Sequence, residues 1–183
     1  MRKLITIGGI SVALLAIAAI GMRFYTKSFS PAGTAQYEKD DLQLWVDYCR
    51  PYKRDREIFG GLIAYNEVWR TGANEATTFH TNKPLMIGGK RLEPGSYSLF
   101  TVPGQDAWSV IFNSETGQWG VKLFSGEANR SAENDILSVE VRSIKTNGTF
   151  EQFTIAFEEM SDEIDMVLMW DQTLVVVPMI AVK

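Results

Sequence analysis

The pattern of hydrophobic and polar positions divides the chain into an apolar N-terminal run and a longer region of short alternating segments. The run starts at Leu4, ends at Met22 and carries no charged side chain. Arg2 and Lys3 precede it. Because about 20 apolar residues suffice for a helix to cross roughly 30 Å of hydrocarbon, residues 1–23 are predicted to form a signal-anchor or transmembrane helix.

A cleaved signal peptide is the alternative for this segment, since Ala16, Ile17 and Ala18 form a small-x-small sequence of the kind that signal peptidase cleaves. The cations before the run place the amino terminus in the cytoplasm if the helix is retained. We therefore expect a single-pass inner-membrane protein with its C-terminal domain in the periplasm. If the segment is cleaved, we expect a secreted domain.

Residues 24–41 are predicted to form a linker, because Ser28, Pro31 and Gly33 interrupt any hydrophobic period. The folded domain is expected to cover residues 42–183.

This domain shows the alternating pattern of β-strands. Residues 42–49 alternate apolar and polar side chains, as half-buried strands do. The pairs Gly88-Gly89 and Asn147-Gly148 predict tight hairpin turns. Further strands are predicted at residues 76–81, 85–87, 90–92, 97–102, 108–112, 136–144, 150–157, 166–170 and 174–180. About nine short strands without a long helical period predict an all-β fold, a two-sheet antiparallel β-sandwich, with a closed barrel as the alternative.

Composition and charge exclude several classes of function. The 183 residues carry a formal net charge of −4, and the sequence pI is about 5.1, which argues against nucleic-acid binding. Cys49 is the one cysteine, so no intramolecular disulfide can form. It is predicted to be a small buried residue.

The inventory of reactive residues favours no common catalytic scheme. His80 is the one histidine, so a zinc site lacks ligands, and neither a nucleophile elbow nor a phosphate-binding glycine loop occurs. The acidic residues at 158–165 lack the spacing of a calcium loop and are predicted to be a solvated turn. The charged residues 53–57 are predicted to be a solvated loop, with a basic contact surface as the alternative. We expect no metal and no cofactor.

One stretch, residues 58–79, combines glycines with aromatic and charged side chains and contains most of the candidate site. The candidate ligand-binding residues are Arg50, Trp69, Arg70, Asn74, Glu75 and Trp119. Indole faces with forked guanidinium donors suit a sugar or an acidic small molecule. In the alternative interpretation, Glu75 pairs with Arg70 or Arg50 and organises the core. A hydrolase using Glu75 needs a second carboxylate at a defined separation.

Several blocks of sequence resemble the bacterial domain-of-unknown-function family 2911. They are Tyr-Cys-Arg-Pro at residues 48–51, Arg-Glu-Ile-Phe-Gly at 56–60, Val-Trp-Arg-Thr-Gly-Ala-Asn-Glu-Ala-Thr-Thr at 68–78, Leu-Glu-Pro-Gly with Tyr-Ser-Leu-Phe-Thr at 92–101, and Gln-Trp-Gly at 118–120. The resemblance implies an exported protein of Gram-negative bacteria and carries over no reaction, ligand or catalytic residue. Cys49 replaces the serine usual in the first block.

Together these patterns predict a membrane-anchored envelope β-domain that acts as an accessory or interaction subunit of a membrane protein complex. The membrane contact is expected along the run from Leu4 to Met22, with a membrane protein as partner. A carbohydrate or small-ligand binding module centred on Trp69, Arg70 and Glu75 is the second hypothesis, and the hydrolase is the third.

Overall fold

The computed structural model describes residues 2–122 and 125–182. Within these ranges, the side chains of residues 2–12, 19, 23 and 24 are not described. The predicted apolar run from Leu4 to Met22 therefore lies partly outside the described side chains.

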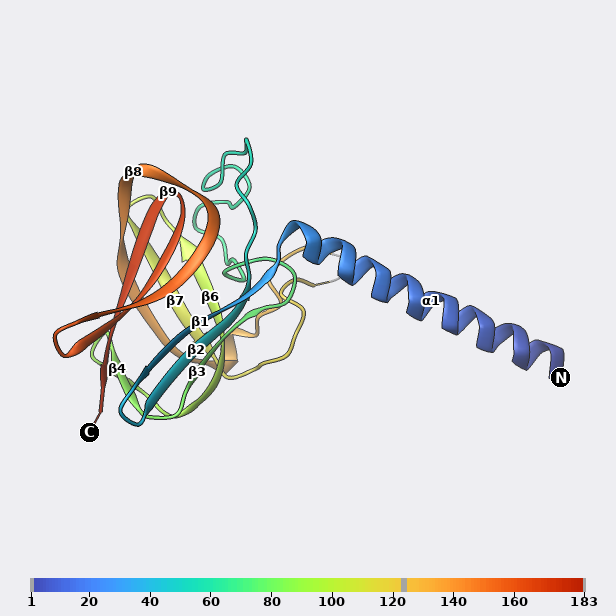
Figure 1. Ribbon diagram of the computed structural model, residues 1–183, viewed down its shortest axis with the longest axis horizontal. Helices are drawn as coiled ribbons and strands as arrows, with labels where there is room; N and C mark the ends of the chain where they lie inside the picture. Colours follow the sequence, from blue (N-terminus) through green and yellow to red (C-terminus); the bar gives the residue numbers. More distant parts are fainter. Residues whose placement is uncertain (1, 123–124, 183) are drawn as a thin grey trace.

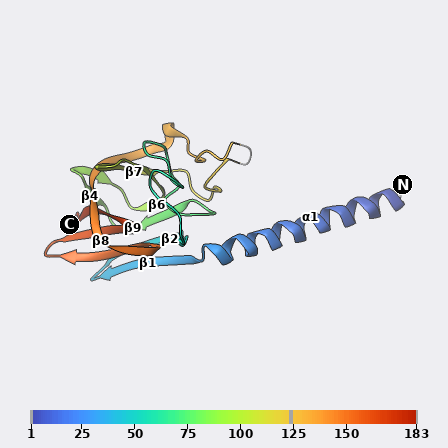
Figure 2. The same cartoon turned by 90° about the horizontal axis from the view of Figure 1, so that it is seen from above.

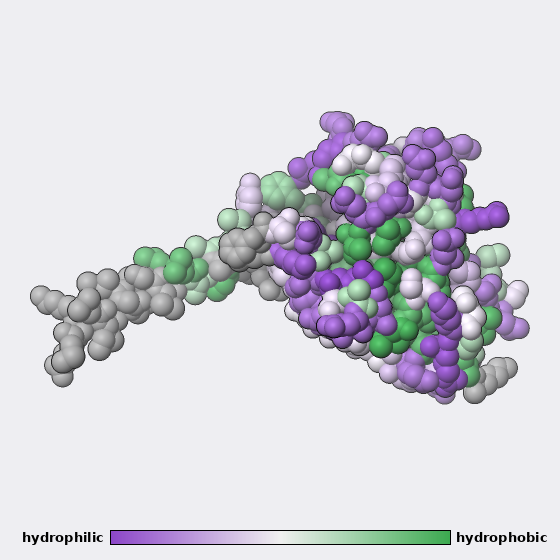
Figure 3. Space-filling view, turned by 180° about the vertical axis from the view of Figure 1, so that it is seen from behind, coloured by the Kyte–Doolittle hydropathy of each residue, from purple (hydrophilic) through white to green (hydrophobic). Residues whose placement is uncertain are grey.

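The N-terminal segment forms α1 (Arg2–Phe29), one continuous helix that projects from the β body (Figures 1 and 2). Large apolar side chains in the described part of α1 are exposed, with exposed fractions of 57% to 71% for Leu14, Leu15, Ile17, Ile20 and Met22. Hydrophobic colouring follows this part of the helix in Figure 3. Among the described residues, no helix reaches the length and hydropathy needed to cross a membrane.

The segment predicted as a linker, residues 24–41, has regular structure instead. The end of α1 occupies its first part, and β1 (Ala32–Lys39) then pairs antiparallel with β2 (Leu42–Cys49) across a turn. Asp40 in this turn has φ 53°, a conformation that aspartate tolerates. Within β1 only Ala35 is buried, so this polar edge strand has no clear hydrophobic period and the sequence pattern missed it.

The remaining strands make the body all-β, as predicted. They are β3 (Thr77–Thr81), β4 (Leu85–Ile87), β5 (Lys90–Leu92), β6 (Gly95–Pro103), β7 (Ala107–Asn113), β8 (Asp135–Met160) and β9 (Glu163–Ala181), with a 3-10 turn η1 (Ala132–Asn134) before β8. The strand order is β1-β2-β3-β6-β7-β8-β9-β4-β5, and all the pairs are antiparallel. The nine strands are linked in a single open sheet. The finer prediction of two separate sheets stays a prediction.

The predicted hairpin turn at Asn147-Gly148 is wrong, because β8 runs through it as one strand of 26 residues. The two strands predicted at 166–170 and 174–180 likewise merge into β9. β8 pairs with β7 up to Arg142 and with β9 from Ser143 onward. The register shifts between Lys145 and Phe150, so the Asn-Gly pair lies in a bulge. Pairing with a continuous partner on both sides of the bulge overrides the local turn preference.

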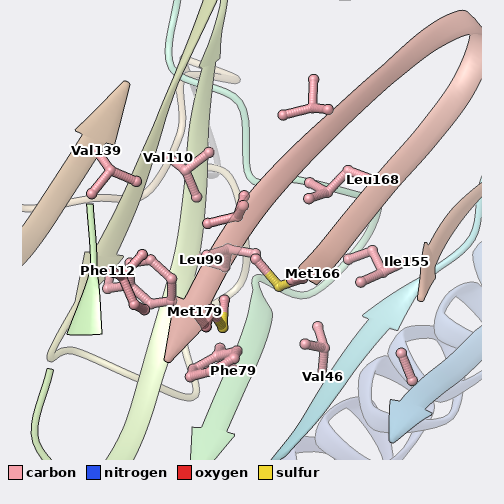
Figure 4. Close-up of a cluster of buried hydrophobic side chains, with 14 of the residues drawn as sticks. Val46, Phe79, Leu99, Val110, Phe112, Val139, Ile155, Met166, Leu168 and Met179 are labelled. Carbon is pink, nitrogen blue, oxygen red and sulfur yellow. The ribbon is translucent and has the colours of Figure 1, made fainter. Parts of the chain in front are cut away.

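The sheet coils on itself, so that the hairpin of β8 and β9 packs against β1 and β2. The hydrophobic core lies inside this coil. The Tyr48 hydroxyl of β2 accepts a hydrogen bond from the Ile155 N–H of β8 at 2.9 Å, and the Tyr37 ring of β1 lies 6.4 Å from that of Phe157. Figure 4 shows a cluster of buried hydrophobic side chains from β2, β3 and β6 to β9, in which Phe79 and Met166 have no exposed surface. This coiled body supports the loops that hold the candidate site.

Candidate functional site

The connection between β2 and β3, residues 50–76, contains every candidate site residue except Trp119. It lies beside the end of α1 (Figure 1). Within it, Thr71 and Asn74 have φ of 56° and 59°, and Gly72 has φ 152°. Positive φ is unusual for a β-branched residue such as Thr71, and such strained positions cluster at functional sites.

Buried hydrogen bonds hold this strained loop in place. The Thr77 hydroxyl donates to the Thr71 carbonyl at 2.6 Å, and the Trp69 indole N–H donates to the Gly72 carbonyl at 3.0 Å. The Trp69 backbone also exchanges two hydrogen bonds with Thr101 of β6. A Cβ at Gly72 would lie 3.0 Å from the Cys49 carbonyl oxygen, so glycine is required for the close approach as well as for its φ. The loop is therefore a rigid part of the body.

Trp69 belongs to the core, with 6% of its surface exposed. Its ring packs against four other aromatic rings at centroid distances between 5.0 and 6.2 Å, those of Phe153, Trp170, Phe59 and Trp108. Aromatic clusters of this kind contribute both buried area and favourable ring-edge geometry. Trp69 consequently forms part of the floor of the site rather than an open stacking surface.

A cleft of about 320 Å³ opens above this floor, at the junction of α1 with the body. We call it the arginine cleft. Its wall residues are Phe29, Ser30, Pro51, Arg54, Arg56, Leu62, Ile63, Trp69, Arg70, Gly72, Ala73 and Trp170. Three of them are arginines and none is acidic, so the cleft carries concentrated positive charge.

Arg70 lies half-buried between the arginine cleft and a smaller hollow of about 160 Å³. A Cβ at Gly120 would overlap the Arg70 side chain, so glycine there leaves the space that Arg70 occupies. The Arg70 Nε is buried without a hydrogen-bond partner, and burial lowers the pKa of its guanidinium. Arginine nevertheless stays charged in proteins, so Arg70 is a half-buried cation whose Nε lacks an acceptor.

The other two arginines are exposed, and each is held in place by contacts with the protein. The Arg54 guanidinium lies over the Phe29 ring at 5.0 Å, and Arg56 donates to the backbone carbonyls of Tyr52 and Lys53. In the part of the chain that the structure describes, no carboxylate forms an ion pair with Arg54, Arg56 or Arg70. Arg54 and Arg56 belong to the charged residues 53–57, which were predicted to form a solvated loop. The alternative prediction for this loop, a basic contact surface, was the only sequence signal for their place at the cleft.

Glu75 and Asn74 face the end of α1 rather than the arginine cleft. Lys27 Nζ lies 3.2 Å from Glu75 Oε1, and the Asn74 side chain donates to the Ser30 carbonyl at 3.4 Å. Burial acts to raise the pKa of Glu75, but hydrogen bonds from its own backbone N–H, from Lys27 and from the Cys49 thiol outweigh it and lower that pKa. Glu75 is therefore an ionised docking residue for the helix.

Arg50 is placed away from the cleft, in the seam between β2 and β8. Its Nε donates to the Phe153 carbonyl at 3.4 Å, and its terminal nitrogen donates to the Thr154 hydroxyl at 3.1 Å. Gln152 in turn donates to the Arg50 carbonyl. Arg50 thus joins strands, and neither Arg50 nor Arg70 forms the ion pair with Glu75 that the alternative interpretation expected.

Trp119 lies next to Glu75 through an isolated backbone bridge, but its ring is 42% exposed and it does not line the arginine cleft. Glu75 and Asp47 both line a separate hollow of about 200 Å³ together with Cys49. Burial raises the pKa of the Cys49 thiol, which disfavours the thiolate. Among residues 2–122 and 125–182, no group of three or more metal-ligating side chains is arranged to hold a metal ion.

Comparison with known proteins gives one match. The family model described as "Protein of unknown function (DUF2911)" matches residues 30–179, which include the strands from β1 to most of β9 and every residue of the arginine cleft except Phe29. No curated protein and no solved structure matches the chain.

Proposed function

Because the chain belongs to the family of proteins of unknown function DUF2911, whose matched region contains nearly all of the cleft, we propose that its body binds a small acidic ligand there. The observation that carries the proposal is the set of three arginines around one cleft, none of which forms an ion pair with a carboxylate among the described residues. Arg54 and Arg56 are exposed and Arg70 is half-buried, and a bound anion would supply the acceptor that the buried Arg70 Nε lacks.

The chemistry and size of the cleft narrow the ligand class. Guanidinium groups bind carboxylate or phosphate oxygens through two parallel hydrogen bonds. The volume of about 320 Å³ lies at the lower end of small-molecule sites, which span roughly 300–1,000 Å³. A neutral sugar fits less well, because stacking needs open aromatic faces and the exposed fractions of Trp69 and Trp170 are 6% and 2%. We propose a small carboxylate or phosphate ester.

Isothermal titration calorimetry on the full chain in detergent tests this proposal. The probes are phthalate for carboxylates, phenyl phosphate for phosphate esters, and benzyl alcohol as a neutral compound of similar size. At least one anion should bind, more weakly as salt increases, and the alcohol should not. Binding of neither anion at millimolar concentration, or equal binding of the alcohol, would overturn the proposal.

Two matched variants connect binding to the cleft. Arg70→Gln should weaken anion binding by about tenfold or more, because a desolvated charge-assisted contact is lost. Arg91→Gln is the control, since Arg91 is exposed and already pairs with Glu93. If both variants bind like the native chain, the anion binds elsewhere and the arginine cleft is not the site.

A second proposal concerns where the body is held. The exposed apolar side chains of α1, including Leu14, Leu15 and Ile17, favour contact with a lipid or protein surface. We propose that α1 attaches the protein to the inner membrane and that the body serves in the periplasm as an accessory subunit of a membrane complex. Mass spectrometry of the mature N-terminus and protease treatment of spheroplasts test this topology. A cleaved N-terminus or a protected body would contradict it.

The accessory role has its own test. Mild detergent extraction followed by affinity purification should recover a membrane protein in a fixed ratio to this chain. A monomer that migrates alone would refute the accessory role without affecting the ligand proposal.

We also propose that the coiled sheet acts as a two-layer sandwich, with the β8–β9 hairpin as the second layer. The hydrogen bond between Ile155 and the Tyr48 hydroxyl supports this arrangement. An experimental structure should show the layers about 10 Å apart over the core. A sheet closed into a continuous hydrogen-bonded barrel would contradict it.

A further inference from the structure

The arginine cleft and the end of α1 share residues. Phe29, the last residue of α1, and Ser30 form one side of the cleft, and the body supplies the others. The loop that places Arg70 in the cleft also places Asn74 and Glu75 against the helix end. A ligand in the cleft therefore contacts a surface that is complete only while the helix end is docked.

We infer that ligand binding in the arginine cleft is coupled to docking of the α1 end on the body, an inference that rests on the function proposed above. Each event strengthens the other, because the docked helix end completes the binding surface. Coupling between two equilibria is reciprocal, so if docking strengthens ligand binding by some factor, ligand binding strengthens docking by the same factor. A change that populates the undocked state therefore weakens ligand binding.

Arg54 contributes to this coupling. Its guanidinium lies over the Phe29 ring at 5.0 Å, and a cation–π contact of this kind keeps the charge at the cleft. Undocking the helix end removes this contact and releases the Arg54 side chain. Conversely, a bound anion favours the position of the Arg54 guanidinium at the cleft and thereby favours the docked helix end.

The dipole of α1 acts in the opposite direction. Its C-terminal end carries about half a negative charge, which disfavours an anion nearby. Lys27 in the last turn offsets this partial charge, although it is itself paired with Glu75. The three arginines belong to the body and attract an anion whether or not the helix end is docked, so the positive sign of the coupling rests on the surface that Phe29 and Ser30 add to the cleft. Ligand binding at the body thereby changes the attachment of the helix, which is the part proposed to lie in the membrane.

Lys27 offers a way to weaken docking without changing the wall of the cleft, because it does not line it. In the full chain in detergent, Lys27→Met should weaken binding of the tighter anion probe by up to about fivefold, the upper end of the effect of a partly exposed ion pair. Lys27→Arg retains the charge and should bind like the native chain. The double variant Lys27→Glu with Glu75→Lys restores an ion pair at this position with the charges exchanged, and it leaves the net charge of the chain unchanged. It should therefore recover most of the anion affinity that Lys27→Met loses.

Hydrogen exchange measured by mass spectrometry reports docking directly. The Ser30 N–H bonds to the Lys27 carbonyl and the Arg50 N–H to the Pro31 carbonyl, so peptides covering residues 27–50 should exchange several-fold more slowly with saturating probe. If the native chain binds the probe while Lys27→Met binds equally well and exchange is unchanged, the coupling is refuted and the cleft remains a binding site. If the native chain binds neither anion, the proposed function itself fails.

Discussion

Two arginines from the same inter-strand connection, Arg50 and Arg70, have opposite environments. Arg50 is surrounded by oxygen acceptors from β8 and joins two parts of the sheet. Arg70 is half-buried beside Gly120, and its buried Nε has no acceptor. The comparison teaches that the chain supplies the partners of Arg50 but leaves the Nε of Arg70 without one, and this difference is why Arg70 and not Arg50 is proposed as a ligand contact.

The largest expected effect concerns the aromatic floor beneath the cleft. Trp69→Ala should lower the free energy of unfolding by about 3–5 kcal/mol, as other buried tryptophan truncations do, because four aromatic neighbours lose contact. Urea unfolding followed by circular dichroism measures this change. Trp119→Ala is the matched control, and should cost less than about 0.5 kcal/mol because its ring is 42% exposed. Equal losses in both variants would show that Trp69 is not a core residue.

Replacing Arg50 tests the structural half of the comparison. Arg50→Met should lower the free energy of unfolding by about 1–3 kcal/mol, because the Phe153 carbonyl and the Thr154 hydroxyl lose a charged donor. Anion affinity should stay within twofold of the native value, since Arg50 does not line the cleft. Calorimetric titration and urea unfolding of the same preparation measure both quantities. A large loss of affinity with native stability would reverse the roles assigned to the two arginines.

Replacing Arg70 tests the other half. Arg70→Met retains the aliphatic contact with the loop and removes the unpaired charge. Without ligand, the free energy of unfolding should therefore stay within about 0.5 kcal/mol of the native value or increase, while anion affinity falls. Urea unfolding in a buffer without phosphate or carboxylate measures the effect on stability. A loss above about 2 kcal/mol would mean that Arg70 has a structural partner and would remove the basis of the comparison.

The sequence predicted the body better than it predicted the site. Alternation at residues 42–49 and the Gly88-Gly89 turn correspond to β2 and to the β4–β5 hairpin, because in both cases local pattern and tertiary pairing agree. They disagree at Asn147-Gly148, where pairing along β9 keeps β8 continuous. They also disagree in β1, whose position depends on β2 rather than on a hydrophobic period of its own.

The site was predicted in part for a similar reason. The combination of glycines with aromatic and charged side chains in residues 58–79 indicated the candidate residues Trp69, Arg70, Asn74 and Glu75. The structure places Arg70 at the cleft. The partners of each side chain depend on distant segments, and no local pattern contains them. Glu75 pairs with Lys27 across 48 positions, and Arg54 reaches the cleft through contact with Phe29. The sequence alone therefore could not separate Arg50 from Arg70.

The smallest expected effect concerns His80, a second basic group whose charge is disfavoured by burial. Burial lowers the pKa of His80, against the opposing effect of Asp47, whose Oδ2 lies 3.6 Å from Nε2. Its ring stacks on Trp45 at 4.6 Å, and Nδ1 lies 2.7 Å from the Ser96 hydroxyl. Unlike arginine, histidine can lose its proton near neutral pH, so burial here changes the charge instead of creating a demand for an anion.

The pH dependence follows from this difference. Below the ordinary histidine pKa of about 6.5, the unfolded chain binds a proton that the folded chain resists. The free energy of unfolding should therefore fall as the pH falls from about 6.5 toward the lowered folded pKa, and His80→Gln should lack this part of the slope. Urea unfolding between about pH 5 and 8 measures both curves. If the native and His80→Gln curves have the same slope, the pKa of His80 is not lowered in the folded protein. If native stability instead rises as the pH falls, Asp47 outweighs burial and raises that pKa.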